Sequence, residues 1–188
     1  MEQRNCIIVH GSADDENDKE YNRHWMKWIK KKLEEKNIKV FAPNMPNPWK
    51  PDYNIYKREF DKLDVDENTI LIGHSSGCAF LVRWLGESQG RVRKLILVAP
   101  WKISSKEFSK EENELYNFKI NNRIKKRFKE IVIFISNDGE EDGKKSARIF
   151  HDVLGGRIIE LKNHGHFTKE DMGTEEFPEL LKVILNGK

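Results

Sequence analysis

The sequence predicts an α/β protein: a single-domain, three-layer α/β/α sandwich with a mainly parallel sheet of about six strands. Short apolar runs rich in β-branched residues alternate with longer segments of helical period along the whole chain. Most of these runs are continuously apolar, as in strands that are covered on both faces. The length of 188 residues suits one domain with a sizeable core, and no internal repeat or linker divides it. We therefore expect residues 1–188 to form one domain.

Six apolar runs are the strand candidates. Short links and right-handed crossovers between them favour one parallel sheet with helices on both sides. In chain order, the six runs are residues 6–10, 39–42, 69–73, 94–99, 131–136 and 157–161.

Two segments carry apolar residues at helical spacing, which predicts helices with one buried face. We interpret their aromatic residues as core rather than as cofactor contacts, and we expect no cofactor. The first stripe contains Tyr21, Trp25, Trp28, Ile29 and Leu33, and the second contains Phe177, Leu180, Leu181, Ile184 and Leu185.

Charged residues are frequent but nearly balanced. The chain has 34 Lys and Arg against 31 Asp and Glu, a net charge of +3, which does not suggest a dedicated nucleic-acid binder. The most basic stretch, residues 123–129, has Ile124 and Phe128 four positions apart. We interpret it as a helix with one buried face rather than as a phosphate-binding patch.

The N-terminal residues predict a cytoplasmic protein without a membrane partner. The apolar run before His10 is too short for the hydrophobic region of a signal peptide and for a membrane span. Cys6 and Cys78 are too few for a disulfide framework and lack the spacing of a metal site, so we expect reduced, mostly buried thiols and no metal.

Residues able to do chemistry follow three of the predicted strands. In open α/β sheets, ligands bind beyond the carboxyl ends of the strands. Ser75 lies in the motif GHSSG, and Asp138 and His166 follow later strands, in that chain order. The motif stands between an apolar strand and the apolar segment CAFLVRWL, which is the setting of a nucleophile elbow. The alternative is a plain strand-to-helix turn.

The glycines of this motif are expected for steric reasons. Gly73 and Gly77 leave room for neighbouring backbone around a sharp turn, and the serine between them can take strained backbone angles.

At these positions the sequence resembles the α/β-hydrolase superfamily, and within it the small serine hydrolases related to retinoblastoma-binding protein nine. The resemblance spans nearly the whole chain. It implies a minimal sheet without a large cap domain, a Ser/Asp/His triad and hydrolysis of an ester or related acyl bond. The motifs that carry it are GHSSG at 73–77, NMPNP at 44–48, LILVAP at 95–100, SND at 136–138 and HGHF at 164–167.

Chemistry assigns the roles of the three residues. A serine hydroxyl is a weak nucleophile, so a base must take its proton, and His166 is our candidate for the base of Ser75. Asp138 is our candidate for the acid that orients this base. Asp152 lies in a helical pattern that should face away, and Asp142 could instead cap the following helix.

The tetrahedral intermediate needs an oxyanion hole. In this fold one donor is the N–H of the residue after the nucleophile, here Ser76. The other donor comes from the loop after the first strand, where Ser12 is the first candidate and Ala13 the next.

Other side chains near the site have less specific interpretations. We expect His74 to pack behind the elbow and His10 to order its loop. His166 follows Gly165, which would let its loop approach the elbow closely, so His164 should be dispensable. The pair His164-x-His166 has no further ligands for a metal. Trp101 follows the fourth strand and either lines the substrate pocket or packs in the core.

Two function classes remain. The first is a cytoplasmic serine hydrolase that cleaves a small ester, thioester or amide, with residues 102–130 as a short helical lid or a surface helix pair. The second is a non-catalytic binding protein that keeps the hydrolase fold and holds a protein or small-molecule partner. A complete Ser/Asp/His set in the expected order favours the first.

Overall fold

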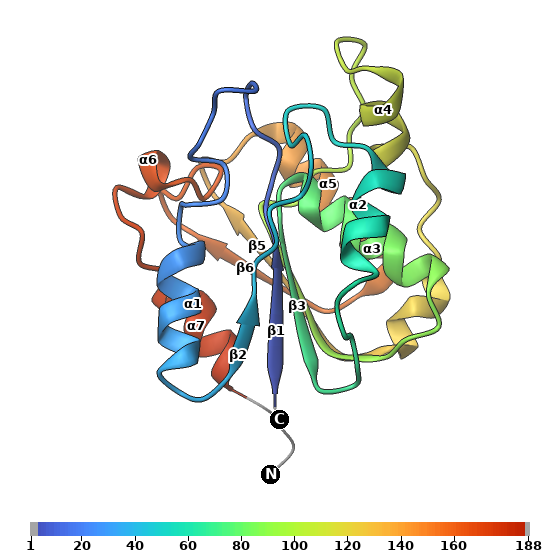
Figure 1. Ribbon diagram of the computed structural model, residues 1–188. Coiled ribbons are helices and arrows are strands. Elements are labelled where there is room, and N and C mark those ends of the chain that lie inside the picture. Colours follow the sequence, from blue (N-terminus) through green and yellow to red (C-terminus); the bar gives the residue numbers. More distant parts are fainter. Residues whose placement is uncertain (1–3, 187–188) are drawn as a thin grey trace.

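Six parallel strands form one sheet in the computed structural model, which describes residues 4–186 (Figure 1). The strand order is β2-β1-β3-β4-β5-β6, so the chain winds outwards in both directions from its first strand. All six predicted strands are present. Their bounds are β1 Asn5–Val9, β2 Lys39–Phe41, β3 Thr69–His74, β4 Val92–Val98, β5 Phe128–Ser136 and β6 Arg157–Leu161.

Helices cover both faces of this sheet, as the fold class predicts. In Figure 1, α1 and α7 lie on one side of the sheet, and α2, α3 and α5 lie on the other. Their bounds are α1 Met26–Glu34, α2 Tyr53–Phe60, α3 Ser76–Glu87, α4 Lys110–Tyr116, α5 Glu141–Leu154, α6 Lys169–Met172 and α7 Pro178–Leu185, with a 3₁₀ helix η1 at Asn122–Lys126.

The apolar strands supply two cores because successive side chains of a strand point to opposite faces. In β4, for example, Leu95 and Leu97 join the core beneath α2 and α3, whereas Ile96 and Val98 join the core beneath α1 and α7. All four side chains are fully buried. Continuous apolar runs are therefore required in the central strands, while β6 at the edge of the sheet is partly exposed.

Two of the helix predictions were wrong in part. Tyr21 belongs to the predicted first stripe but precedes α1, which begins at Met26, and its ring contacts His10 instead. The stretch 123–129 is not one helix. Its first part is the 3₁₀ turn η1, and Phe128 already begins β5, because this strand extends three residues further towards the N-terminus than predicted, to pair with Val92 of β4.

Residues 102–130 contain α4 and η1 and are anchored to the domain. A capping box between Ser109 and Glu112 starts α4. The apolar residues of the segment enter the core that α2 and α3 share, and a gating role for it stays a prediction. The buried ones are Leu115, Tyr116, Ile120 and Ile124.

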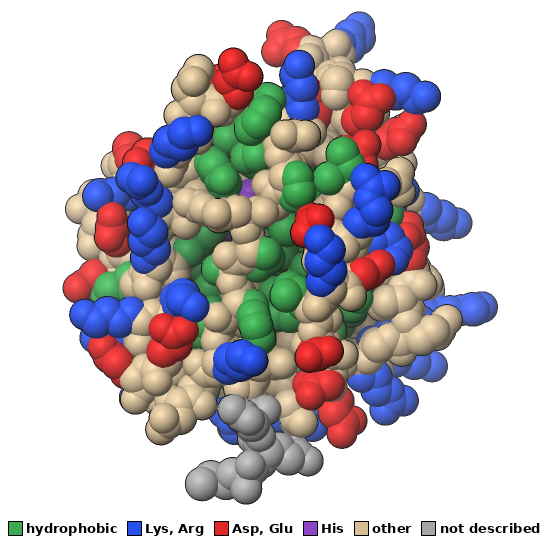
Figure 2. Space-filling model, viewed as in Figure 1, with side chains coloured by type: hydrophobic (Ala, Val, Ile, Leu, Met, Phe, Trp, Pro, Cys, Tyr) green, Lys and Arg blue, Asp and Glu red, His purple; other side chains and the backbone are tan. Residues whose placement is uncertain are grey.

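The surface combines charge with a central apolar area. Figure 2 shows Lys and Arg interspersed with Asp and Glu around this face, and hydrophobic side chains gathered in its middle over the β2 edge of the sheet. None of the helices within residues 4–186 combines the length and the hydropathy needed to cross a bilayer.

Candidate active site

Ser75 occupies a sharp, strained turn between β3 and α3. Its backbone angles are φ 50° and ψ −119°, and a positive φ is unfavourable for a residue with a Cβ. Neighbouring backbone holds the turn: the Ser75 N–H donates to the carbonyl of Val98 (3.0 Å), and the Trp101 N–H donates to the carbonyl of Ser75 (3.2 Å). The sheet thus imposes the strained conformation that the GHSSG motif predicts.

The two glycines of the motif are required by close packing. A Cβ on Gly73 would lie 2.8 Å from the backbone of Cys78, and a Cβ on Gly77 would lie 2.4 Å from the carbonyl oxygen of Val9. Such distances are shorter than carbon contacts allow. The start of α3 can therefore approach β1 and β3 only because neither glycine carries a side chain.

A third glycine brings the loop after β1 over the nucleophile. A Cβ on Gly11 would lie 2.9 Å from Cβ of Ser75. His10 orders this loop, as expected: its Nδ1–H donates to the carbonyl of Gly11 (2.7 Å), and its Nε2 accepts from the Met45 N–H (2.9 Å). Burial lowers the pKa of His10 to about 4, so the ring is neutral and both hydrogen bonds persist at neutral pH.

The candidate oxyanion donors lie together at this loop. The Ser12 side chain donates to the Ser76 hydroxyl (3.0 Å), which places these two residues side by side next to Ser75. Ala13, the second choice from sequence, donates its N–H to the carbonyl of Pro48 (3.1 Å) and is occupied. Within residues 4–186 no acceptor engages the Ser12 N–H, and the Ser76 N–H is one of the free donors that begin a helix.

His166 lies beside the elbow on the loop after β6. The Nε2–H of His74, the residue before the nucleophile, donates to the carbonyl oxygen of His166 (2.8 Å), and the two rings are 5.3 Å apart. This bond joins positions 92 residues apart in the sequence. Within the described residues, His166 and Ser75 are not hydrogen-bonded to each other. Hydrogen bonds between a catalytic base and its nucleophile often tighten only when substrate is bound.

Gly165, the residue before His166, must lack a side chain for a different reason from the one we expected. Gly165 has φ 48°, and a Cβ there would lie 2.5 Å from Asp171, whose carboxylate accepts from the His166 N–H (2.8 Å). The close approach is therefore to α6 and not to the elbow. Buried Phe167 anchors the same loop in the core.

Asp138 and Glu140 contact the base His166 and its loop in different ways. Asp138 accepts from the Ser136 hydroxyl and from the Gly165 N–H (3.0 Å), so it holds the loop that carries His166. Both bonds end on Oδ1, and they hold the pKa of Asp138 below its usual range. The carboxylate closest to the ring is Glu140, whose Oε2 lies 3.9 Å from Nδ1 of His166. Sequence reasoning missed Glu140, because no spacing pattern separates it from its acidic neighbours.

The two remaining aspartates point elsewhere. Asp152 is exposed on α5, as expected. Asp142 lies in the first turn of α5 and pairs with Lys145 (2.9 Å), but the N-cap residue is Glu140, so a capping role for Asp142 was wrong.

Burial sets the protonation of the histidines at the site. Desolvation lowers the pKa of His166, while the nearby carboxylates of Glu140 and Asp171 act in the opposite direction. The ring is therefore neutral at pH 7 and can accept a proton. Fully buried His74 has a pKa far below its usual range for the same reason, and its Nδ1 has no hydrogen-bond partner among the described residues.

His164 and Trp101 take structural contacts. His164 donates from Nδ1 to the carbonyl of Lys162 (2.7 Å), and its ring packs 5.4 Å from the ring of Phe167. Trp101 packs against the core, which is one of its two interpretations: its indole N–H donates to the carbonyl of Ile103 (2.9 Å). Its ring lies 6.1 Å from the ring of His166, and a role in lining the substrate pocket stays a prediction.

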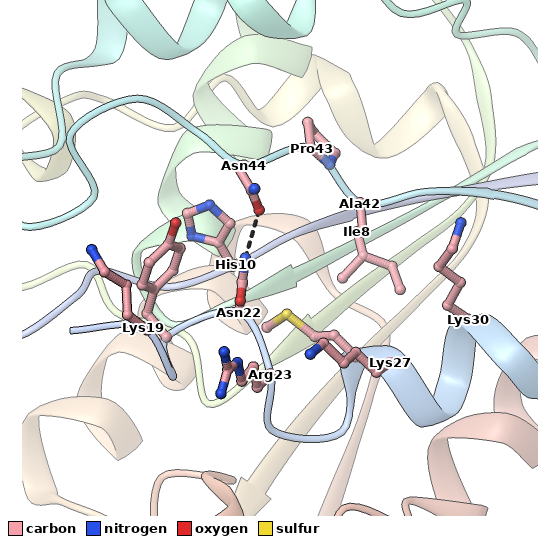
Figure 3. A pocket seen from close by; sticks show the side chains of 12 residues that line it. Ile8, His10, Lys19, Asn22, Arg23, Lys27, Lys30, Ala42, Pro43 and Asn44 are labelled. Atoms are coloured by element: carbon pink, nitrogen blue, oxygen red, sulfur yellow. Dashed lines mark hydrogen bonds between the residues drawn. The ribbon is translucent and has the colours of Figure 1, made fainter. Parts of the chain in front are cut away.

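A separate cavity of about 550 Å³ lies next to the candidate site, between α1 and the end of β2 (Figure 3). His10 forms part of its wall, and Asn22 donates to Asn44 across it (2.5 Å). Neither Ser75 nor His166 lines this cavity. Among residues 4–186, no cluster of three or more His, Cys, Asp or Glu side chains is arranged to hold a metal ion.

The chain is similar to known proteins over most of its length. A family model described as serine hydrolase matches residues 6–186. Serine hydrolase RBBP9 of Rattus norvegicus is 28% identical over 163 residues, which cover 85% of this chain and 84% of the relative. The YdeN protein of Bacillus subtilis, named as a hydrolase, is 25% identical over 96% of this chain and 94% of its own. The crystal structure of the ydeN gene product superposes with a TM-score of 0.84 at 23% identity, covering 97% of both chains.

Proposed function

Because the chain belongs to the serine hydrolase family, we propose that it cleaves a small ester, thioester or amide through an acyl-enzyme on Ser75. The observation that carries this proposal is the strained elbow, which presents Ser75 under the loop that begins with Gly11. A plain strand-to-helix turn does not require a positive φ at a serine.

Ser75, His166 and Asp138 take the roles of nucleophile, base and acid in this proposal. Neutral His166 removes the hydroxyl proton as Ser75 attacks the acyl carbonyl, and it later returns this proton to the leaving group. Water then attacks the acyl-enzyme with the same base, which releases the acid product and free Ser75. Asp138 holds the loop of His166 through Oδ1. Its role is to orient and stabilise the imidazolium.

Backbone donors stabilise the charge that develops on the carbonyl oxygen. The N–H groups of Ser12 and Ser76 are the proposed pair, because their residues touch each other beside Ser75 and no acceptor within residues 4–186 engages the Ser12 N–H. Donors fixed before the reaction need no reorganisation in the transition state, and losing one typically costs about 3 kcal/mol in the barrier. Trp101, with its ring near His166, is the proposed contact for the substrate.

Fluorophosphonate labelling and a chromogenic ester assay test the proposal. Only an elbow serine with a base and oxyanion donors reacts rapidly with a fluorophosphonate, so peptide mapping should place the label on Ser75 alone. Ser75→Ala should abolish labelling and lower kcat by roughly 10⁴-fold or more while the fold is retained. Ser104→Ala is the matched control, because Ser104 is exposed. Folded protein that is neither labelled nor active would instead favour the binding protein.

A further inference from the structure

His74 is the last residue of β3 and directly precedes the nucleophile Ser75. Its side chain is 3% exposed, and its ring lies 6.0 Å from that of Trp25 and 5.7 Å from that of His24. From this buried position its Nε2–H donates to the carbonyl oxygen of His166 (2.8 Å). The ring therefore connects the residue before the nucleophile to the backbone of the proposed base.

The other hydrogen bonds of the loop that carries the base run to different parts of the fold. The Gly165 N–H donates to Asp138 after β5 (3.0 Å), and the His166 N–H donates to Asp171 of α6 (2.8 Å). In the sheet, β4 and β5 stand between β3 and β6. In the described part of the chain, only the bond from His74 joins this loop to the elbow. It is therefore the contact that sets how far the base stands from the nucleophile.

Core packing alone does not explain a histidine at this position. A carbonyl oxygen only accepts hydrogen bonds, so Nε2 of His74 carries the proton and Nδ1 is an acceptor. This Nδ1 is buried and has no hydrogen-bond partner among the described residues, which is unfavourable in a core. A leucine would fill the space without burying an unpaired acceptor. The property that distinguishes histidine from leucine here is the Nε2–H donor.

We propose that His74 is a positioning residue that holds the base His166 within reach of Ser75 through its Nε2–H. This inference rests on the proposed function, because it explains how the proposed base is kept in place. Proton transfer needs the base within hydrogen-bond reach of the nucleophile, and a displacement of about 1 Å can cost about 100-fold in rate. His74 itself exchanges no proton, because burial keeps its pKa well below the usual range and the ring stays neutral.

Comparing His74→Leu with His74→Gln is the direct test. Leucine has no donor, whereas the side-chain amide of glutamine presents an N–H at about the same distance from the backbone as Nε2 of histidine. We expect His74→Leu to lower kcat about 30-fold with little change in KM, because only the position of the base is lost. His74→Gln should restore kcat to within about threefold of wild type. The rate of fluorophosphonate labelling should follow kcat in both variants, since it needs the same base.

His74→Asn keeps the test decisive if His74→Leu does not fold. Asparagine carries the same amide on a side chain one methylene shorter, so its N–H falls short of the His166 carbonyl. Its kcat should therefore be reduced as expected for His74→Leu, although a donor is present. Equal kcat in His74→Asn and His74→Gln would overturn the inference.

Trp25→Phe is the matched control for a loosened core. Trp25 is fully buried against the His74 ring, and within residues 4–186 its indole N–H has no hydrogen-bond partner. The change removes core volume without touching the bond to His166, so it should lower the thermal unfolding temperature and leave kcat within about twofold of wild type. A loss of kcat as large as that in His74→Leu would assign the effect to packing and overturn the inference.

A double-mutant cycle with the base identifies the route of the effect. In His166→Ala no base is left to position, so adding His74→Leu should cause little further loss of the residual activity. A further loss as large as that in the wild-type background would overturn the inference. Wild-type labelling at Ser75 with an equal rate in folded His74→Leu would overturn it alone. Wild-type protein that is not labelled at Ser75 would overturn the proposed function, and this inference with it.

Discussion

Replacing Glu140 by glutamine measures how much the carboxylate beside the base contributes, and replacing Asp138 by asparagine measures the proposed acid. The two side chains differ in how they reach His166. Glu140 lies 3.9 Å from Nδ1 of the ring, and its side chain is 64% exposed. Asp138 instead contacts the backbone of the same loop at Gly165.

The distance of Glu140 from His166 and its exposure to solvent limit how much it can stabilise the imidazolium. Two unit charges about 4 Å apart interact by about 1 kcal/mol in a water-like medium, and an exposed carboxylate is close to that limit. Stabilisation of the imidazolium by Glu140 is then worth about fivefold in kcat. Asp138→Asn should cost about 10⁴-fold, because an amide in place of the triad acid leaves the wrong tautomer of the base.

A pH profile gives a second, independent readout. His166 must be neutral to act as a base, so kcat/KM should rise with pH through the pKa of this ring, which burial places below its usual 6.5. Glu140 opposes that shift. In Glu140→Gln the pKa should therefore fall further, and the acid limb of the profile should move to lower pH.

The assay is steady-state hydrolysis of one chromogenic ester by wild type, Asp138→Asn, Glu140→Gln and Asp142→Asn. Asp142 is the control, because its ion pair with Lys145 is on the surface and should be worth about 0.5 kcal/mol of stability at most. An inactive Glu140→Gln beside an active Asp138→Asn would refute the assignment of Asp138 and move the acid to Glu140. An inactive Asp142→Asn with intact fold would refute both.

Three further predictions concern the loops around the base and the nucleophile. Gly11→Ala should lower kcat roughly tenfold or more by displacing the loop over the elbow serine, whereas Gly90→Ala, with nothing within 4 Å of its added Cβ, should match wild type in the same ester assay. His164→Ala should keep most activity and His166→Ala should lose it, and the reverse result would exchange their roles. His10 has a folded pKa of about 4 against 6.5 when unfolded, so its stabilising effect is complete above pH 6.5 and declines as the pH falls towards 4. Urea unfolding should show about 2 kcal/mol less stability at pH 5 than at pH 7.5 from this group, and His10→Gln should weaken that pH dependence. The same pH dependence in His10→Gln as in wild type would contradict the role given to His10.

The sequence alone determined the sheet, the elbow and the order of the candidate residues. Strands such as β4 are recognisable because burial on both faces requires a continuous apolar run. The elbow is recognisable because a strained serine needs glycine at fixed positions on either side of it, which Gly73 and Gly77 satisfy. Both signals are local, so a few consecutive residues carry them.

Local signals were less reliable where two structures share one pattern. The stretch 123–129 has helical spacing at Ile124 and Phe128, yet Phe128 pairs with Val92 in the sheet. Phe128 is part of a strand because it pairs with the neighbouring strand β4, and the spacing of residues within one segment does not report on that neighbour.

Only the tertiary structure decided which side chains meet at the site. The bond from His74 to His166 spans 92 positions, and the bond from Ser12 to Ser76 spans 64. It also placed Glu140, rather than Asp138, closest to the ring of the base. The physical reason is that these contacts depend on how whole elements pack across the sheet edge, and the spacing of residues along the chain carries no information about distances between elements.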